Sequence, residues 1–364
     1  MKTFIRLVAI GAILTQTIIT PATLDACTGI TIKPKDGSVV FARTLEFAAD
    51  LHSNIVILPR GQKYVGTTSS GQPGLRWETK YGVVGANAFG LPQVVDGLNE
   101  HGLAVNLFYF PGYAKYQEIP AGGENDAIAP WELGTYLLGT CGTVKEAVAA
   151  AKSVRVGNVV QAQMGMVPPV HFVVTDASGA SVVVEYVAGE LQIHANPLGV
   201  MTNAPSFDWH MTNLNNYVNL FTENESARNV DGVELRGFGQ GTGMLGLPGD
   251  FTPPSRFVRA AAFSKAALPV ETSAQGVLQA FHILNNFDIP QGIARTTAHG
   301  KIDADYTMWT GASDLTQLRY YFRTHSNSQI RMVDLKKADF NATEMKSISM
   351  QGEERIEDVT AQAK

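Results

Sequence analysis

The chain has 364 residues, of which 45% are hydrophobic and 17% are charged, and its formal net charge is −5 at pH 7. This length and composition supply enough apolar side chains for one large core. The charge is mildly acidic and no basic cluster occurs, which argues against nucleic acid as a partner. No repeat or linker marks a boundary, so we expect one domain over residues 27–335 and a peripheral tail over residues 336–364.

The first 26 residues predict a secretory signal peptide. Lys2 and Arg6 precede an uncharged, mostly apolar run over residues 7–19, and small residues follow up to Ala26. The run is shorter than the ~20 residues that span a bilayer. We therefore expect cleavage after Ala26, export to the periplasm or the medium, and no stable membrane insertion. Cleavage removes two of the 28 basic residues and one of the 33 acidic ones, which changes the formal charge from −5 to −6.

Cleavage after Ala26 would leave Cys27 with a thiol and a free α-amino group on one residue. The thiolate is a nucleophile, and an α-amino group with a pKa near ~8 can accept the thiol proton at neutral pH. Two other roles for Cys27 stay open. Residues 24–27 are similar to a lipobox, which would attach a lipid to the cysteine, although Asp25 fits that signal poorly. Export also permits a disulfide to Cys141, but the apolar sequence around Cys141 favours a buried free thiol.

The rest of the chain predicts strands first. Turn residues separate the strand-like segments, and the one over residues 170–195 reads as a hairpin that continues into a third strand around Ala188 and Gly189. The predicted strand regions are residues 38–47, 53–59, 81–89, 97–110, 170–195 and 306–325.

Helices are predicted between and after these strands. Thr143 and Glu146 have the spacing of a capping box for a helix over residues 143–154. Apolar residues recur one helical turn apart over residues 207–218, and residues 273–287 are amphipathic. Antiparallel strands in two groups with helices between them indicate a layered α+β fold.

A cysteine nucleophile needs a nearby cation that favours the thiolate and fixed donors for the oxyanion. Arg43 is the nearest plausible cation, although an exposed arginine on a two-sided strand is an equally simple interpretation. Glu46 could accept a hydrogen bond from the α-amino group. Strand alternation places Arg43 and Glu46 on opposite faces, so their joint use needs a bulge or a strand end between them.

After the cysteine that cleavage exposes, five sequence blocks follow in order: "FARTLEF", "DGLNEHGLAVNL", "FPGYAKY", "VMTNAPSFDWHMTNLNNY" and "GFGQGTGMLGLPGDFTPPSRFVRAA". From "CTGITI" to "RYYFRT" the chain resembles the choloylglycine hydrolase family, the bile salt hydrolases and penicillin V acylases among the N-terminal nucleophile hydrolases. The resemblance implies a four-layer αββα fold with two stacked antiparallel sheets.

The resemblance also implies catalytic roles. Cys27 matches the nucleophile, and Arg43 matches the arginine beside it. Asn203 matches an asparagine whose side chain helps to form the oxyanion hole. Arg256 matches an arginine of the catalytic pocket.

Two further positions bear on substrate and geometry. Tyr109 lies where bile salt hydrolases usually carry asparagine and penicillin V acylases carry tyrosine, and the resemblance implies that its backbone donates to the oxyanion. Glu46 departs from the family pattern, which has aspartate, so its carboxylate reaches one methylene further.

These residues predict hydrolysis of a linear amide with an apolar acyl group, and Tyr109 favours phenoxyacetyl amides such as penicillin V. We expect loops over residues 65–74 and 108–116 to line part of the acyl pocket. Conjugated bile salts and N-acyl homoserine lactones are alternative substrates, and a lipid-anchored binding protein on the same fold is the non-enzymatic alternative. The family resemblance further implies a homo-oligomer, specifically a homotetramer.

Other signals lack their required context. "GTGMLG", residues 241–246, has the spacing of a dinucleotide-binding loop but runs into prolines instead of opening a helix, which predicts a glycine-rich loop. His171 and His210 have no local motif that would make either one the partner of a papain-like cysteine. The eight histidines show no HExxH spacing and no Cys/His pair suited to zinc. We therefore expect no cofactor and no metal.

Overall fold

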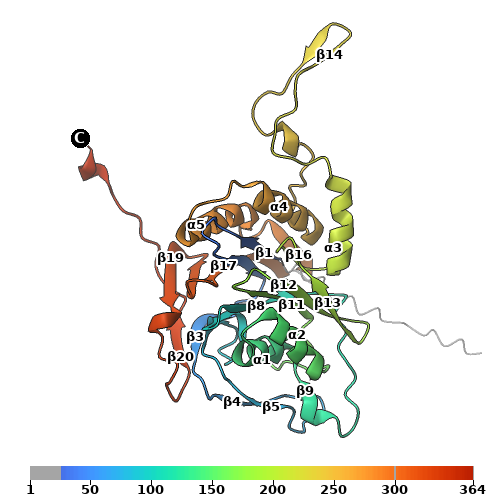
Figure 1. Ribbon diagram of the computed structural model, residues 1–364, viewed down its shortest axis with the longest axis vertical. Helices are drawn as coiled ribbons and strands as arrows, with labels where there is room; N and C mark the ends of the chain where they lie inside the picture. The colour runs from blue at the N-terminus through green and yellow to red at the C-terminus, as the bar shows by residue number, and fades with distance from the viewer. Residues whose placement is uncertain (1–25, 299–300, 364) are drawn as a thin grey trace, which may run out of the picture.

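The computed structural model describes residues 26–298 and 301–363, and the predicted signal peptide lies outside them apart from Ala26. Two antiparallel sheets lie face to face, and helices cover the outer face of each (Figure 1). This is the four-layer αββα arrangement that the family resemblance implied. The prediction of a layered α+β fold is confirmed.

The first sheet contains the strand that begins at Cys27. Helix α4 packs on β1, and helix α5 packs on β1, β2 and β17. Because the other face of this sheet meets the second sheet, every residue of β1 is buried. In spatial order the strands are β1 (Cys27–Ile32), β2 (Val40–Phe47), β17 (Lys301–Asp314), β18 (Arg319–Thr324) and β19 (Asn327–Asp334), with β16 (Ala294–Ala298) also paired to β17; the helices are α4 (Pro253–Ala266) and α5 (Ser273–Leu284).

The second sheet is larger and carries helices α1 and α2 on its outer face. Helix α1 packs on β7 and β8, and helix α2 packs on β11. In spatial order the strands are β13 (Glu190–Ala195), β12 (Ser181–Val187), β11 (Val170–Asp176), β8 (Leu103–Tyr109), β7 (Val94–Asn99), β6 (Val83–Asn87), β3 (Asn54–Leu58) and β20 (Lys346–Ser349); the helices are α1 (Leu133–Thr140) and α2 (Val144–Ser153).

The predicted three-stranded unit over residues 170–195 is confirmed as β11, β12 and β13. The turn between β12 and β13 is made by Ala188 and Gly189, whose φ angles are 54° and 86°. Two successive positive φ values produce the backbone twist that a two-residue hairpin needs.

Smaller elements lie outside the two large sheets. The most prominent is an arm, residues 218–250, which projects from the body and carries the hairpin of β14 and β15 near its tip (Figure 1). The "GTGMLG" segment lies in this arm and forms only a short turn of helix over Thr242–Met244. The remaining strands and the remaining α-helix are β4 (Lys63–Val65), β5 (Arg76–Glu78), β9 (Ala127–Ile128), β10 (Arg155–Val156), β14 (Arg228–Val230), β15 (Val233–Leu235) and α3 (Phe207–Asn213).

The helix predictions are confirmed in position but not in every detail. Thr143 Oγ1 accepts the N–H of Glu146 at 3.2 Å, whereas the Glu146 carboxylate accepts the N–H of Gly142, so only half of the predicted capping box forms. The helix expected over residues 207–218 is α-helical only to Asn213 and then tightens into a 3₁₀ turn. Helix α4 was not predicted, because its opening Pro253 and Pro254 look like a loop, although proline is tolerated in a first helical turn.

The prediction of a peripheral tail from residue 336 is wrong for its first part. Strand β20 pairs with β3 and completes the second sheet. Phe340 and Met350 are buried in the core, and the Phe340 ring lies so close to Gly82 that a Cβ at that glycine would sit 2.1 Å from it. Among the described residues of the tail, only residues 351–363 form a segment that is exposed throughout.

Candidate active site

Cys27 is buried at the first position of β1, and strand pairing sets its neighbours. The register of β1 and β2 places Cys27 opposite Leu45 and Gly29 opposite Arg43. Directly opposite residues in an antiparallel pair share a face of the sheet. The side chains of Cys27 and Arg43 therefore emerge on the same face.

Asn203 reaches Cys27 along the other edge of β1. The N–H of Gly29 donates to the carbonyl of Met201 at 2.7 Å, and the N–H of Met201 donates back at 3.0 Å. This antiparallel bridge brings residue 203 beside residue 27. The backbone N–H of Cys27 donates to Asn203 Oδ1 at 2.7 Å.

Ala26 is still attached to Cys27 in the described chain, so the Cys27 nitrogen is a peptide N–H here. Ala26 is buried, and its carbonyl accepts the N–H of Glu46 at 3.0 Å. Cleavage between Ala26 and Cys27 would turn this nitrogen into the α-amino group.

Arg256, on α4, ties these segments together. Its Nε donates to the carbonyl of Phe251 at 2.8 Å, and its Nη1 donates to Thr28 Oγ1 at 2.9 Å and to the carbonyl of Cys27. Its Nη2 donates to Asn203 Oδ1 at 2.7 Å. Every nitrogen of this buried guanidinium is therefore hydrogen-bonded.

These contacts fix the orientation of the Asn203 amide. Oδ1 receives N–H donors from both Cys27 and Arg256, so it must be the oxygen of the amide. Nδ2 donates to the carbonyl oxygen of Tyr109 at 2.8 Å, which leaves its second N–H for another acceptor. The structure thus gives the Tyr109 backbone an accepting contact with Asn203, and its role as a donor to the oxyanion stays a prediction.

Arg43 is fully buried, so the alternative of an exposed arginine is wrong. Its guanidinium packs over the Phe108 ring with 4.3 Å to the ring centroid. Nε donates to the carbonyl of Thr44 at 3.1 Å and lies 3.9 Å from Asp96 Oδ2, and Nη1 donates to the carbonyl of Leu107. Nη2 is buried and has no hydrogen-bond partner within residues 26–298 and 301–363.

Glu46 lines the same cavity as Arg43 despite strand alternation. Strand β17 shifts register opposite Glu46, between Thr307 and Trp309, and such a bulge increases the local twist. The predicted irregularity therefore exists, but on the strand that faces β2. Glu46 Oε1 accepts the Thr307 hydroxyl at 2.7 Å, and Oε2 is buried without a hydrogen-bond partner in the described part of the chain.

Burial and charge together perturb the ionisable groups of the site. Burial raises the pKa of the Cys27 thiol, Arg43 and Arg256 oppose that rise, and Glu46 adds to it. Burial raises the pKa of Glu46 to about 7, against the opposing effect of Arg256. Of these two groups only Glu46 has a pKa near neutral, because burial holds the pKa of the Cys27 thiol above its usual value.

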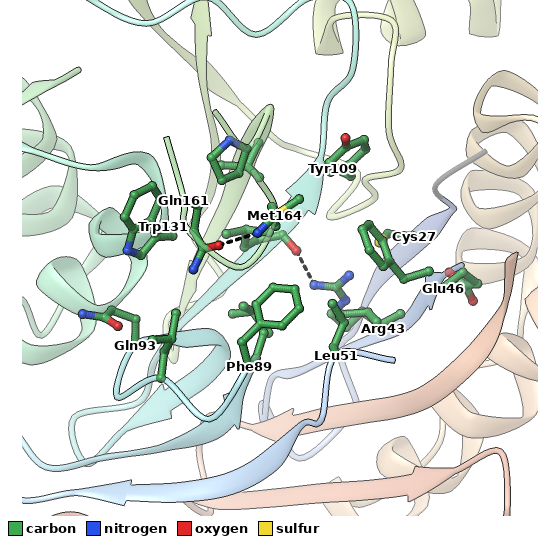
Figure 2. Close-up of a pocket in the computed structure, with 18 residues that line it drawn as sticks. Cys27, Arg43, Glu46, Leu51, Phe89, Gln93, Tyr109, Trp131, Gln161 and Met164 are labelled. Carbon is green, nitrogen blue, oxygen red and sulfur yellow. Dashed lines mark hydrogen bonds between the residues drawn. The ribbon is translucent and has the colours of Figure 1, made fainter. Parts of the chain in front are cut away.

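An apolar cavity opens beside Cys27, with a volume of ≈ 90 Å³. Figure 2 shows Cys27, Arg43 and Glu46 on one side of it and Trp131 and Gln161 on the other. Residues 65–74, expected to line the acyl pocket, do not line it, and of residues 108–116 only Tyr109 does. The main side chains that the sequence prediction missed are Leu51, Phe89, Leu91, Trp131, Gln161 and Met164.

The structure also tests the disulfide, histidine and metal candidates from the sequence. Cys27 and Cys141 are both free, so the disulfide alternative is wrong. His171 and His210 are fully buried and contact backbone carbonyls. Among the described residues no group of three or more His, Cys, Asp or Glu side chains could hold a metal ion, and no helix there has both the length and the apolarity to cross a membrane.

The stacked sheets place the chain among the N-terminal nucleophile hydrolase folds. The chain belongs to the choloylglycine hydrolase family, whose model, described as linear amide C-N hydrolases, matches residues 27–348. It is therefore an amidohydrolase that acts on linear amides.

Individual relatives agree with this assignment. The chain is 32% identical over 323 residues to a bile salt hydrolase/transferase of Clostridium perfringens, which covers 88% of this chain and 96% of the relative. Its structure is similar to that of a variant of conjugated bile acid hydrolase from the same species, with a TM-score of 0.81, 31% identity and coverage of 92% and 100%. It is also similar to penicillin V acylase from Agrobacterium tumefaciens, with a TM-score of 0.71, 25% identity and coverage of 89% and 91%.

Proposed function

We propose that the mature protein hydrolyses linear amides with the Cys27 thiolate as nucleophile and the Cys27 α-amino group as base. The observation that carries this proposal is the hydrogen bond from the Cys27 nitrogen to Asn203 Oδ1, at the edge of a cavity that Cys27 itself lines. This contact puts the future base, the nucleophile and an amide donor in one place. Geometry of this kind is what acyl transfer requires.

The reaction then follows in two halves. The α-amino group takes the thiol proton, and sulfur attacks the amide carbon while the carbonyl oxygen becomes an oxyanion that the second N–H of Asn203 Nδ2 stabilises. The C–N bond breaks, and the ammonium group gives its proton to the leaving amine. Water next attacks the thioester while the same amine takes its proton, and the C–S bond breaks. The ammonium group returns this proton to the sulfur, which releases the acid and regenerates the free thiol.

Arg43 and Glu46 adjust the charge of this site. Nη2 of Arg43 has no hydrogen-bond partner among the described residues, and the Arg43 guanidinium opposes the rise that burial causes in the pKa of the Cys27 thiol, which favours the thiolate. Glu46 carries a carboxyl with a pKa of about 7, and its Oε2 has no hydrogen-bond partner in the described part of the chain, so it can accept a hydrogen bond from the ammonium form of the Cys27 amine.

The cavity that Cys27 lines is apolar and small, with a volume of ≈ 90 Å³. It therefore favours the substrate whose acyl group has the smaller apolar part, as in penicillin V. A phenoxyacetyl group presents one ring and a short linker, but a bile acid presents four fused rings. Tyr109 at the cavity wall is the residue expected for this preference.

Conjugated bile salt hydrolysis is the second candidate, favoured by the 32% identity to the clostridial bile salt hydrolase/transferase. The test measures kcat/KM of the cleaved protein for penicillin V and glycocholate in parallel, with Cys27→Ala as the blank. A preference for penicillin V supports the proposal. A preference for glycocholate overturns the substrate assignment but keeps the cysteine mechanism, and undiminished turnover by Cys27→Ala overturns that mechanism.

Export and a free amino terminus belong to the same proposal. The intact mass of the exported protein should correspond to a chain that begins at Cys27. A mass increased by a diacylglyceryl group would instead mark Cys27 as a lipid anchor and contradict the nucleophile assignment.

Self-association as a homotetramer is also part of the proposal. The arm over residues 218–250 exposes several large apolar side chains away from the body, among them Val218, Phe238 and Leu245, which a contact with another copy of the chain would cover. Light scattering coupled to gel filtration should give a mass four times that of the chain. A monomeric mass that persists at high protein concentration would contradict it.

A further inference from the structure

Two buried histidines lie behind the catalytic asparagine without touching Cys27. His171 comes from β11, in the second sheet, and His210 comes from α3. Both side chains are fully buried. Their Nε2 atoms approach two consecutive backbone carbonyls, Thr202 O at 3.1 Å and Asn203 O at 2.9 Å.

The direction of these hydrogen bonds is set by chemistry. A carbonyl oxygen only accepts, so the hydrogen in both contacts must be on Nε2 of the histidine. Nδ1 of His210 is buried and has no partner among the residues described here, as expected for a neutral ring that carries its only hydrogen on Nε2. Burial lowers the pKa of His210 to about 4, which keeps the ring neutral at pH 7.

The buried side chain of Glu185 links His171 to the helix that carries His210. Glu185, on β12, lies 3.0 Å from Nδ1 of His171 through Oε1. The same oxygen accepts the N–H of Phe207 at 3.1 Å, and Phe207 is the first residue of the helix that carries His210. Glu185 thus orients His171 directly and holds the start of α3.

An aromatic ring also stacks on each histidine ring. Phe110 stacks on His171 with 4.3 Å between centroids and an interplanar angle of 10°. Phe257 stacks on His210 with 4.6 Å and 7°. The rings therefore cannot swing away from the carbonyls without disturbing their stacking partners.

We propose that His171 and His210 are positioning residues that hold the peptide carbonyls on the two sides of Asn203 and so fix the direction of its side-chain amide. The carbonyl of Thr202 precedes the Asn203 Cα, and the carbonyl of Asn203 follows it. With both peptide planes anchored, the Cα–Cβ bond of Asn203 has one direction, and Nδ2 meets the Tyr109 carbonyl and the oxyanion from a constant angle.

This inference rests on the proposed function, because it takes Asn203 as the oxyanion donor. It adds two residues that never contact substrate, and it predicts a defect in the chemical step. A displacement of about 1 Å at a catalytic group costs roughly 100-fold in rate.

The experiment uses three variants of the cleaved protein. His210→Phe keeps a ring against Phe257 but removes the donor. His210→Gln restores an N–H donor at a similar reach, and His282→Phe, on the exposed face of α5, is the matched control. The substrate is whichever of penicillin V and glycocholate the wild type hydrolyses faster.

We expect kcat of His210→Phe to fall by about 100-fold while KM changes less than about threefold, because the acyl cavity is untouched. His210→Gln should regain at least a tenth of the wild-type kcat, and His282→Phe should equal the wild type. Alkylation of Cys27 by iodoacetamide, mapped by mass spectrometry, should keep its wild-type rate in all three variants.

A wild-type kcat in His210→Phe would overturn the inference. A loss of kcat that His210→Gln does not restore would also overturn it. The same holds if His210→Phe slows the alkylation of Cys27 as much as it lowers kcat, since both results would indicate general damage of the site. If the proposed function itself is wrong, the wild type will hydrolyse neither amide, or Cys27→Ala will remain active.

Discussion

The two sides of Cys27 differ in how completely their polar groups are bonded. On the α4 side, every guanidinium nitrogen of Arg256 has a partner, and most of these partners are backbone or amide oxygens of the site itself. On the β2 side, Arg43 Nη2 and Glu46 Oε2 are buried and lack partners in the part of the chain described. The first side holds the strand ends in place, and the second offers unused hydrogen-bonding groups to the cavity.

This difference predicts that the α4 side contributes mainly to stability and the β2 side mainly to the reaction rate. A buried polar group without a partner costs about 1–3 kcal/mol, and such groups are uncommon in folded proteins. Two of them beside the proposed nucleophile are explained if a substrate, a thiolate or an ammonium group supplies the missing partner during the reaction. We therefore expect substitutions on the α4 side to affect folding first and those on the β2 side to affect rate first.

The largest effect should come from Cys27, which belongs to both sides. Cys27→Ala should reduce kcat/KM by roughly 10⁴-fold or more, because it removes the proposed nucleophile. Assay of the cleaved variant against the better amide substrate checks this. Cys141→Ala is the matched control, since that thiol is also buried but belongs to a separate core cluster, and it should retain wild-type kcat/KM.

Arg256→Met should lower the free energy of unfolding by about 3–5 kcal/mol, because it leaves several buried oxygens, including Asn203 Oδ1 and Thr28 Oγ1, short of a donor. Urea unfolding followed by tryptophan fluorescence measures the change. A loss of activity with unchanged stability would contradict the structural role assigned to the α4 side.

Arg43→Met should cut kcat by about 100-fold, the cost of removing one preorganised electrostatic group. Its effect on unfolding should be smaller than that of Arg256→Met, because Asp96 keeps hydrogen bonds of 2.7 Å from both Tyr320 and Asn106. Steady-state kinetics and urea unfolding on the same preparation measure the changes in kcat and in unfolding free energy. Equal stability losses in the two arginine variants would remove the contrast between the two sides.

Glu46 should make stability depend on pH in a chain that retains Ala26. Above pH 4.5 the unfolded chain ionises this carboxyl, whereas the folded chain keeps it protonated up to about pH 7. The folded state then binds more protons, so its stability falls as pH rises through this window, by at most about 3 kcal/mol from this group. The difference in unfolding free energy between wild type and Glu46→Gln, measured from pH 4.5 to 8, should show this decline.

Glu271→Gln is the control for the pH experiment, because Glu271 is an exposed carboxylate paired only with Lys35 at the surface. A flat difference curve for Glu46→Gln would show that the carboxyl ionises normally. In activity assays Glu46→Asp should keep turnover and Glu46→Ala should lose most of it, and near-wild-type turnover by Glu46→Ala would remove Glu46 from the site.

The sequence was most informative where local patterns decide structure. Alternation and a tight turn predict the β1–β2 hairpin, and the hairpin places Arg43 beside Cys27. Asn203 is 176 residues from Cys27, so its position came only from the family resemblance. No periodicity of the chain encodes a bridge such as that between Gly29 and Met201.

What sequence reasoning missed has physical reasons of its own. Trp131 and Met164 line the cavity from irregular segments, where no repeating pattern assigns a direction to a side chain. Strand β20, "KSIS", is polar and exposed, and it joins the sheet only because the edge of β3 offers it backbone partners. No local motif assigned a role to His171 or His210, because their positions depend on backbone carbonyls that a sequence does not display.

The attachment of Ala26 has a consequence for when the enzyme works. With residue 26 in place, the nitrogen of Cys27 is an amide and cannot take a proton from the thiol, although the strands, Asn203 and Arg256 already stand around it. On the proposed mechanism, one peptide-bond cleavage completes a site that folding has otherwise finished. If the cell cleaves the chain only during export, the hydrolase would thus be inactive on the side of the membrane where it is made.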